Sequence, residues 1–215
     1  MQGRGESSTN RDTGEMSAAR RRALWCRTLV DGRTDAIRAA FATLGVGVPD
    51  LRWTPAASDC VAEPNRFFVD HWNDLRGGRD LPLRRALDPV GLRPALGFVN
   101  LVEATDDGVD FMYRVFGSFV GAAIGRDMTG RLVSEAPVDR HLVDLSVAAC
   151  LAVGLRRAPL LIRRAGAGEP GALRWERVFF PFDAGDGRVA QLAICAVPMD
   201  DTGRALRLDP FQTDR

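Results

Sequence analysis

Two strand-forming runs near the end of the chain constrain the fold most, because each run is apolar on both of its faces. In residues 173–182, one alternate set includes Trp175 and Phe179, and the other includes Val178, Phe180 and Phe182. Residues 183–187 supply turn-forming Asp and Gly, and residues 187–199 repeat the two-sided apolar pattern. A strand with one face in water alternates cleanly between apolar and polar residues. We therefore expect a sheet whose two faces are both covered.

The remaining segments predict an α+β class. Strand formers fill residues 98–104, 110–116 and 159–164, and the first two are separated by a turn. Helical patterns fill residues 118–124 and 138–154. Strands that are segregated from helices along a chain are typical of α+β folds.

The first 76 residues are expected to form an extension and a flanking helix. Residues 1–16 are polar and have the composition of a disordered tail. Short helices are predicted from Ser17 to about Val30 and from Thr34 to Leu44, and residues 45–60 are predicted to form a linker. The spacing of Phe67, Phe68, Trp72 and Leu75 predicts a helix at about 64–76, which two glycines end.

Composition excludes several classes of function. The net charge of +1 over 215 residues argues against a dedicated nucleic-acid binder. No apolar run is long enough to span a bilayer, and no signal peptide is visible, so we expect a cytoplasmic protein. Four cysteines without a CxxC pair and two histidines argue against a metal site. No nucleophile elbow, Walker loop or HExxH motif is present, so no catalytic residues are predicted and the protein is expected not to be an enzyme.

A series of landmarks adds a resemblance. The landmarks are Trp72–Arg84, Leu87-Asp88-Pro89, Tyr113-Arg114-Val115-Phe116-Gly117 and Gly125–Arg131. In this order they resemble bacterial PAS-type sensory domains, in the branch of small stand-alone proteins of the proteobacterial type. The resemblance implies a PAS-like five-stranded antiparallel sheet with short helices on one face, plus an N-terminal helical extension. It places the domain at residues 61–200, with an extension at 1–60 and a tail at 201–215.

Arg114 is the first candidate for a ligand contact. It alternates with Met112 and Phe116, so it is expected on an apolar face, where a charge needs a partner. Asp127 and Glu176 are the internal candidates for that partner, and an anionic ligand is the alternative.

The resemblance implies a cavity between the sheet and the helices of residues 118–150. Candidate ligand contacts there are Phe116, Phe119, Asp127, Thr129 and His141, and Glu176 is a further candidate for a ligand contact. The alternative for Asp127 and Thr129 is a structural loop, and the alternative for His141 is an ordinary solvated side chain. Some PAS relatives hold haem through a His on this helix, but a lone His speaks against haem here. The Asn-Cys-Arg-Phe context of the photoactive flavin subgroup is missing, so flavin is not expected and the cofactor is unknown.

The resulting hypothesis is a non-enzymatic sensory or regulatory protein that binds a small molecule and signals through protein–protein contacts. Since no output module is recognisable, we expect a separate signalling protein as partner. The alternative is a ligand-free dimerisation or adaptor module whose core is filled by its own phenylalanines. The two-sided apolar strands predict either a homodimer through the outer face of the sheet or a cover from the helix around Trp72.

Overall fold

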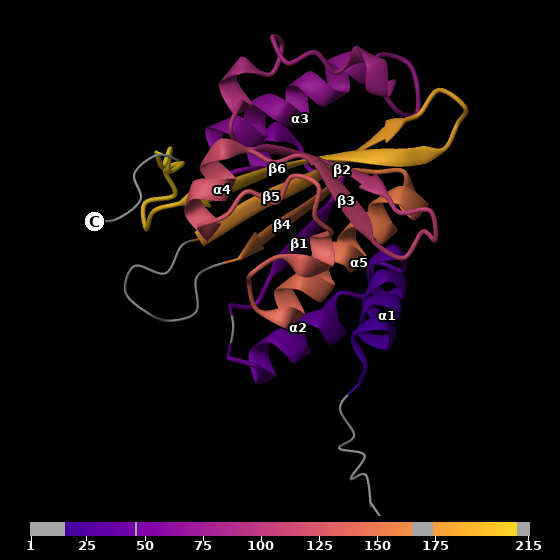
Figure 1. Cartoon of the computed structure of the whole chain (residues 1–215), viewed down its shortest axis with the longest axis vertical. Coiled ribbons are helices and arrows are strands. Elements are labelled where there is room, and N and C mark those ends of the chain that lie inside the picture. Colours follow the sequence, from indigo (N-terminus) through magenta and orange to yellow (C-terminus); the bar gives the residue numbers. More distant parts are fainter. Residues whose placement is uncertain (1–15, 46, 165–173, 210–215) are drawn as a thin grey trace, which may run out of the picture.

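The two-sided strands lie in the middle of one antiparallel sheet. The computed structural model describes residues 16–45, 47–164 and 174–209. Its sheet has the strand order β1-β4-β5-β6-β2-β3 (Figure 1). The strands are β1 (Asp50–Trp53), β2 (Val99–Ala104), β3 (Phe111–Val115), β4 (Leu160–Arg164), β5 (Arg174–Asp183) and β6 (Val189–Met199). The predicted α+β class is confirmed, and all five predicted strands are present.

Strand β1 corrects the expectation of a linker at residues 45–60. It pairs with the edge of β4, from Asp50 opposite Arg163 to Trp53 opposite Leu160. The run is only four residues long and is followed closely by a proline, so it has no periodicity of its own. Its order comes from its neighbours: Trp53 Nε1 donates a hydrogen bond of 3.1 Å to the Leu29 carbonyl.

The outer face of the sheet is covered by helix α3 (Glu63–Arg76), which lies above the sheet in Figure 1. The Phe68 and Phe180 rings are 4.5 Å apart, and Trp72 Nε1 donates a hydrogen bond of 3.0 Å to the Pro181 carbonyl. Val178, Phe180 and Phe182 are all buried in this layer. The chain's own Trp72 helix is therefore the cover, as the second of the two alternatives anticipated.

The inner face packs against helix α5 (Arg140–Arg156) and the short helix α4 (Ser118–Ile124). Helices α1 (Ala18–Val30) and α2 (Asp35–Thr43) lie beyond α5, below the sheet in Figure 1. The capping predictions at Ser17 and at Gly77 are confirmed, since Ser17 accepts a bond from Arg20 N–H and Gly77 ends α3.

Buried ion pairs fasten α1 to α5. Asp144, which is 1% exposed, accepts hydrogen bonds from Arg21 Nε at 2.7 Å and from Arg22 Nε at 2.6 Å. Arg22 also lies 3.8 Å from Asp110. The N-terminal helices thus share the core of the inner face, with Trp25, Leu29 and further apolar residues of α1 buried in it.

Short 3₁₀ turns lie at Ala57–Asp59, Arg84–Ala86, Arg93–Ala95 and Val133–Glu135. The tail predicted at residues 1–16 lies outside the described residues except for Met16, as does Leu173 of the predicted strand. In the described part of the chain, no helix has the length and apolar character needed to cross a bilayer, and no three metal-ligating side chains are grouped.

Candidate functional site

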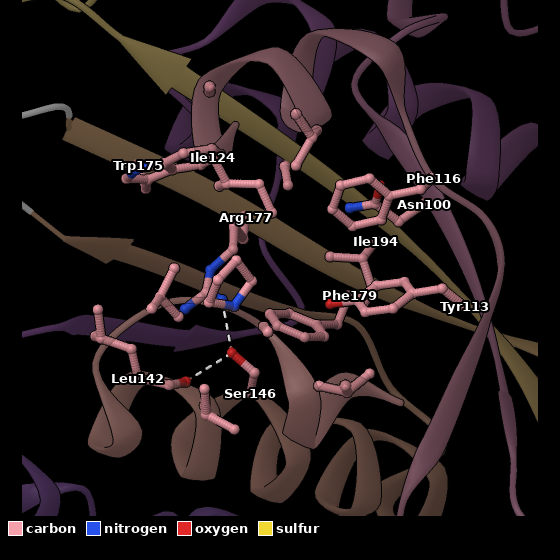
Figure 2. A pocket seen from close by; sticks show the side chains of 18 of the residues that line it. Asn100, Tyr113, Phe116, Ile124, Leu142, Ser146, Trp175, Arg177, Phe179 and Ile194 are labelled. Atoms are coloured by element: carbon pink, nitrogen blue, oxygen red, sulfur yellow. Dashed lines mark hydrogen bonds between the residues drawn. The ribbon is translucent and has the colours of Figure 1, made fainter. Parts of the chain in front are cut away.

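A pocket of about 370 Å³ lies between the inner face of the sheet and the helices α4 and α5. Figure 2 shows side chains of the sheet meeting those of α5 across it. Its aromatic walls are Tyr113, Phe116, Trp175 and Phe179, and Tyr113 and Phe116 meet edge to face at 4.8 Å. Aliphatic side chains from α4, α5, β6 and the 3₁₀ turn at 133–135 complete the wall, among them Val120, Ile124, Val133, Leu142 and Ile194.

Arg177 is the central polar group of this pocket. It follows Trp175 and precedes Phe179 on the same face of β5, and its side chain extends from the sheet to α5 (Figure 2). Its Nη1 donates a hydrogen bond of 2.8 Å to Ser146 Oγ, and its guanidinium carbon lies 5.7 Å from the centre of the Phe179 ring. No carboxylate pairs with Arg177 among the described residues. Burial, and next the charge of Arg164, lower the pKa of the Arg177 guanidinium to about 10, so it remains a cation at neutral pH.

Two further hydrogen-bond donors border the same space. Asn100 uses Oδ1 to accept from Gly117 N–H at 2.8 Å, and its Nδ2 bonds no described residue. The Tyr113 hydroxyl points into the pocket and also bonds no described residue (Figure 2). Burial raises the pKa of Tyr113, so this hydroxyl keeps its proton.

Arg164 and Ser146 complete the polar lining. Arg164 lies opposite Trp175 on the neighbouring strand β4, and the nearby carboxylate of Asp139 partly offsets the effect of burial, which lowers its pKa. Ser146 Oγ donates to the Leu142 carbonyl at 2.7 Å and therefore receives the Arg177 bond on a lone pair. The pocket is lined by two cations and by no carboxylate among the described residues.

Of the seven ligand contacts expected from the sequence, only Phe116 lines the pocket. Arg114 is exposed and pairs with Glu103 on the adjacent strand, in place of Asp127 or Glu176. Strand β3 is the edge of the sheet, so the end of its face is left open to solvent and the charge needs no buried partner.

Glu176 lies on the opposite face of the sheet and is completely buried. It accepts hydrogen bonds from the backbone N–H groups of Val61 at 2.8 Å and Ala62 at 2.9 Å. Asn65 Nδ2 at 3.1 Å and Arg163 Nε at 3.0 Å complete its shell. This carboxylate therefore fixes the start of α3 on the sheet.

The other four candidates also lie elsewhere. Phe119 packs on Phe98, with ring centres 5.0 Å apart. Asp127 accepts bonds of 2.8 Å from the backbone and the hydroxyl of Thr129, which makes a structural loop. His141 Nδ1 lies 3.2 Å from Asp139 and its ring faces Trp25 at 6.5 Å. None of the four lines the pocket.

The residues that the sequence analysis missed are Arg177, Ser146, Asn100 and Tyr113. The alternation of β5 already placed Arg177 between Trp175 and Phe179, which is a charge between two aromatics on one face. This pattern of a charge among apolar neighbours was as clear for Arg177 as for Arg114. Because β5 is a central strand, the charge of Arg177 is the one that becomes buried.

The sheet order and the position of the pocket agree with one family. Residues 61–192, more than half of the chain, match the family described as PAS domain. The chain belongs to the PAS domain family. No curated protein and no solved structure was found to match it.

Membership assigns the chain a coarse role as a sensory or regulatory module. The matched residues of the PAS domain begin just before α3 and end within β6. They include α3, both pocket helices and the residues Arg177 and Ser146. Helices α1 and α2 and strand β1 precede the match, although the structure joins them to the same core.

Proposed function

We propose that this PAS domain is a non-enzymatic sensor that binds a small molecule in the pocket beside Arg177 and signals through contacts with another protein. The observation that carries the proposal is the pocket itself. Its volume of about 370 Å³ is within the range of small-molecule sites, and it is apolar with a few convergent polar groups.

The alternative of a self-filled adaptor core is less well supported. Of the phenylalanines that could fill the inner core, Phe180 and Phe182 face α3 on the other side of the sheet, and Phe119 packs there too. Phe116 and Phe179 line the pocket and leave it open. The space that an adaptor would fill is therefore retained.

The signal has a mechanical route in this proposal. Ser146 on the pocket wall and Asp144, which holds α1, lie two residues apart on α5. A ligand that draws Arg177 away from Ser146 would change the restraint on α5 and so the hold on α1. This route is a spatial argument, and its element with two states would be the α1–α5 contact.

We also propose that the protein forms a homodimer. The outer face of the sheet is not its interface, because α3 covers that face. Sedimentation of the full chain at micromolar concentration measures the state directly. A monomer at all concentrations would leave a separate signalling protein as the partner.

Native mass spectrometry of the full chain, purified without denaturation, tests ligand binding. A reproducible bound mass that denaturation removes is the expected result. Two alanines of α4 give a matched pair of variants, because Ala123 lines the pocket and its neighbour Ala122 does not. Ala123→Leu should abolish the bound mass, whereas Ala122→Leu should retain it. If no mass is bound, or if both variants retain it, the sensor in this pocket is wrong and the adaptor is favoured.

A further inference from the structure

We infer that the pocket ligand is an organic anion, a carboxylate on a compact apolar or aromatic body, and that Arg177 receives the carboxylate. The inference rests on the proposed function, since it names the chemical class of the ligand for the same pocket. It is carried by the combination of an unpaired cation, donors without acceptors and an apolar enclosure.

The charge of the pocket favours an anionic ligand. A guanidinium carries five N–H donors and accepts nothing. Arg177 uses one nitrogen on the neutral Ser146 hydroxyl, and the second cation of the pocket, Arg164, lowers its pKa further after burial. A buried cation is stable when it meets an opposite charge. Among the described residues no acidic side chain meets that need, and an anionic ligand in the pocket would supply the missing charge.

The hydrogen-bonding groups of the pocket also favour an anionic ligand. The Asn100 Nδ2 group and the Tyr113 hydroxyl, both without a partner among the described residues, face the same space as Arg177 (Figure 2). All of these groups can donate, and the Ser146 hydroxyl is the one acceptor that the described residues offer to them. A carboxylate has two oxygens that accept several bonds, including two parallel ones from one guanidinium. A neutral ligand with its own donors would leave the set unmatched.

The walls define the remainder of the ligand. Phe116, Phe179 and Trp175 surround the space next to the guanidinium with aromatic surface, and aliphatic residues of α4 and α5 close it. A volume of about 370 Å³ is at the lower end of small-molecule sites. An inorganic anion would leave this apolar volume unused, which favours a body of one ring or a short chain.

Two molecules of the same shape test the charge. Hydrocinnamate carries a carboxylate, and hydrocinnamamide replaces it with a neutral amide of the same size. Titration calorimetry of each with the full chain should show tighter binding of the carboxylate, by about tenfold or more, as expected for charge-assisted hydrogen bonds.

Variants assign the preference to Arg177. In Arg177→Gln, the affinity for hydrocinnamate should fall by about tenfold or more, while the affinity for hydrocinnamamide changes less than about threefold. Retained amide binding also shows that the variant is folded and that its pocket is intact. The matched control is Arg114→Gln, because Arg114 is exposed and lies outside the pocket. It should leave both affinities unchanged.

Each other outcome is decisive. If the amide binds as tightly as the carboxylate, or if Arg177→Gln weakens both equally, the anion class is wrong while a small-molecule site remains. If neither molecule binds at about 10 mM, the inference is overturned for this ligand class. The bound mass in native mass spectrometry then shows separately whether the sensor itself stands.

Discussion

Glu176 and Arg177 are neighbours on β5, yet they face opposite layers of the molecule and are treated in opposite ways. Glu176 enters the layer under α3, where four donor groups surround its two oxygens. Arg177 enters the layer under α5, where a neutral hydroxyl is its one hydrogen-bond partner among the described residues. The outer layer is a closed core around a satisfied charge, and the inner layer is an open pocket around an unsatisfied one.

The difference separates a structural charge from a functional one. A buried carboxylate with a full set of donors defines how two elements dock, and its removal leaves those donors unpaired. A buried guanidinium without a counter-charge reduces stability unless a ligand supplies the charge. Such a cost is characteristic of binding sites, where stability and activity are in conflict.

The largest effect is expected from Glu176→Ala. The substitution removes the acceptor of the Val61 and Ala62 backbone N–H groups and one of the acceptors of Asn65 and of Arg163, which keep a backbone carbonyl and, for Arg163, Asp50. It should lower the free energy of unfolding by about 3–5 kcal/mol. Urea denaturation measures the loss. The control is Glu103→Ala, which removes an exposed pair with Arg114 and should cost less than about 1 kcal/mol. Equal losses in the two variants would contradict the structural role of Glu176.

A smaller loss of stability is expected from Asp144→Ala, which removes the ion pairs between α1 and α5. Arg21 is nearly buried and loses its carboxylate, but Arg22 keeps Asp110 within 3.8 Å and is partly exposed. We therefore expect a loss of about 2–3 kcal/mol in urea denaturation. Hydrogen exchange should speed up in residues 18–30 first. Unchanged exchange in α1 would show that its apolar contacts hold it without the ion pairs. Asp127→Ala, in an exposed loop, is the control.

Arg177→Met should act in the opposite direction and raise the free energy of unfolding by about 1–2 kcal/mol, because it removes an uncompensated buried charge. The sign depends on pH. The pKa of Arg177 is lowered from 12.5 to about 10 in the folded protein, so folding disfavours the charged form. This cost is fully present below pH 10 and declines as the pH rises from 10 towards 12.5. The advantage of Arg177→Met over the wild type should shrink across that window.

Denaturation of both proteins over the pH range measures the difference directly. Arg114→Met is the control, since this exposed side chain should shift stability by less than about 0.5 kcal/mol. A lower stability of Arg177→Met at neutral pH would mean that the hydrogen bond to Ser146 outweighs the burial of the charge, and that the inner layer is as structural as the outer one.

The sequence predicted most of the fold because the two-sided apolar runs of β5 and β6 and the caps of the helices are local signals. It predicted that both faces are covered, and it named the Trp72 helix as one possible cover. It could not assign a face to Arg177, because both alternate sets of β5 are apolar and only the docking of α3 and α5 distinguishes them. Strand β1 was missed for a related reason, since its order depends on β4.

The candidate site was harder to predict from the sequence. The resemblance located the cavity between the sheet and residues 118–150, where the pocket lies. The choice of Arg114 failed because the strand order was needed to show that β3 is an edge. Glu176 was predicted as a partner of Arg114 or a ligand contact, but it is buried on the opposite face of the sheet. Its partners come from residues 61–65 and 163, which no periodicity connects to it.

The smallest expected effect is a change in the alkylation rate of two cysteines. Because one cysteine lies in each layer, the two rates report the local opening of each layer separately. Cys26 on α1 and Cys60 before α3 are 6% and 5% exposed. Burial raises the pKa of both thiols, that of Cys60 to about 12, so little thiolate exists near pH 8. Alkylation by iodoacetamide should therefore be slow in the native wild type and wait for local opening.

Each buried carboxylate, Asp144 or Glu176, should control the labelling rate of the cysteine in its own layer. At low urea, where local opening outruns global unfolding, Asp144→Ala should speed the labelling of Cys26 severalfold and leave Cys60 near its wild-type rate. Glu176→Ala should do the reverse, because Glu176 bonds the two residues that follow Cys60. Peptide mass mapping reads both sites in one sample. Buried Cys150 and Cys195 report global unfolding and serve as the internal reference. Equal acceleration at Cys26 and Cys60 in both variants would mean that the two layers open as one unit. The layers would then differ in the pocket and not in their local stability.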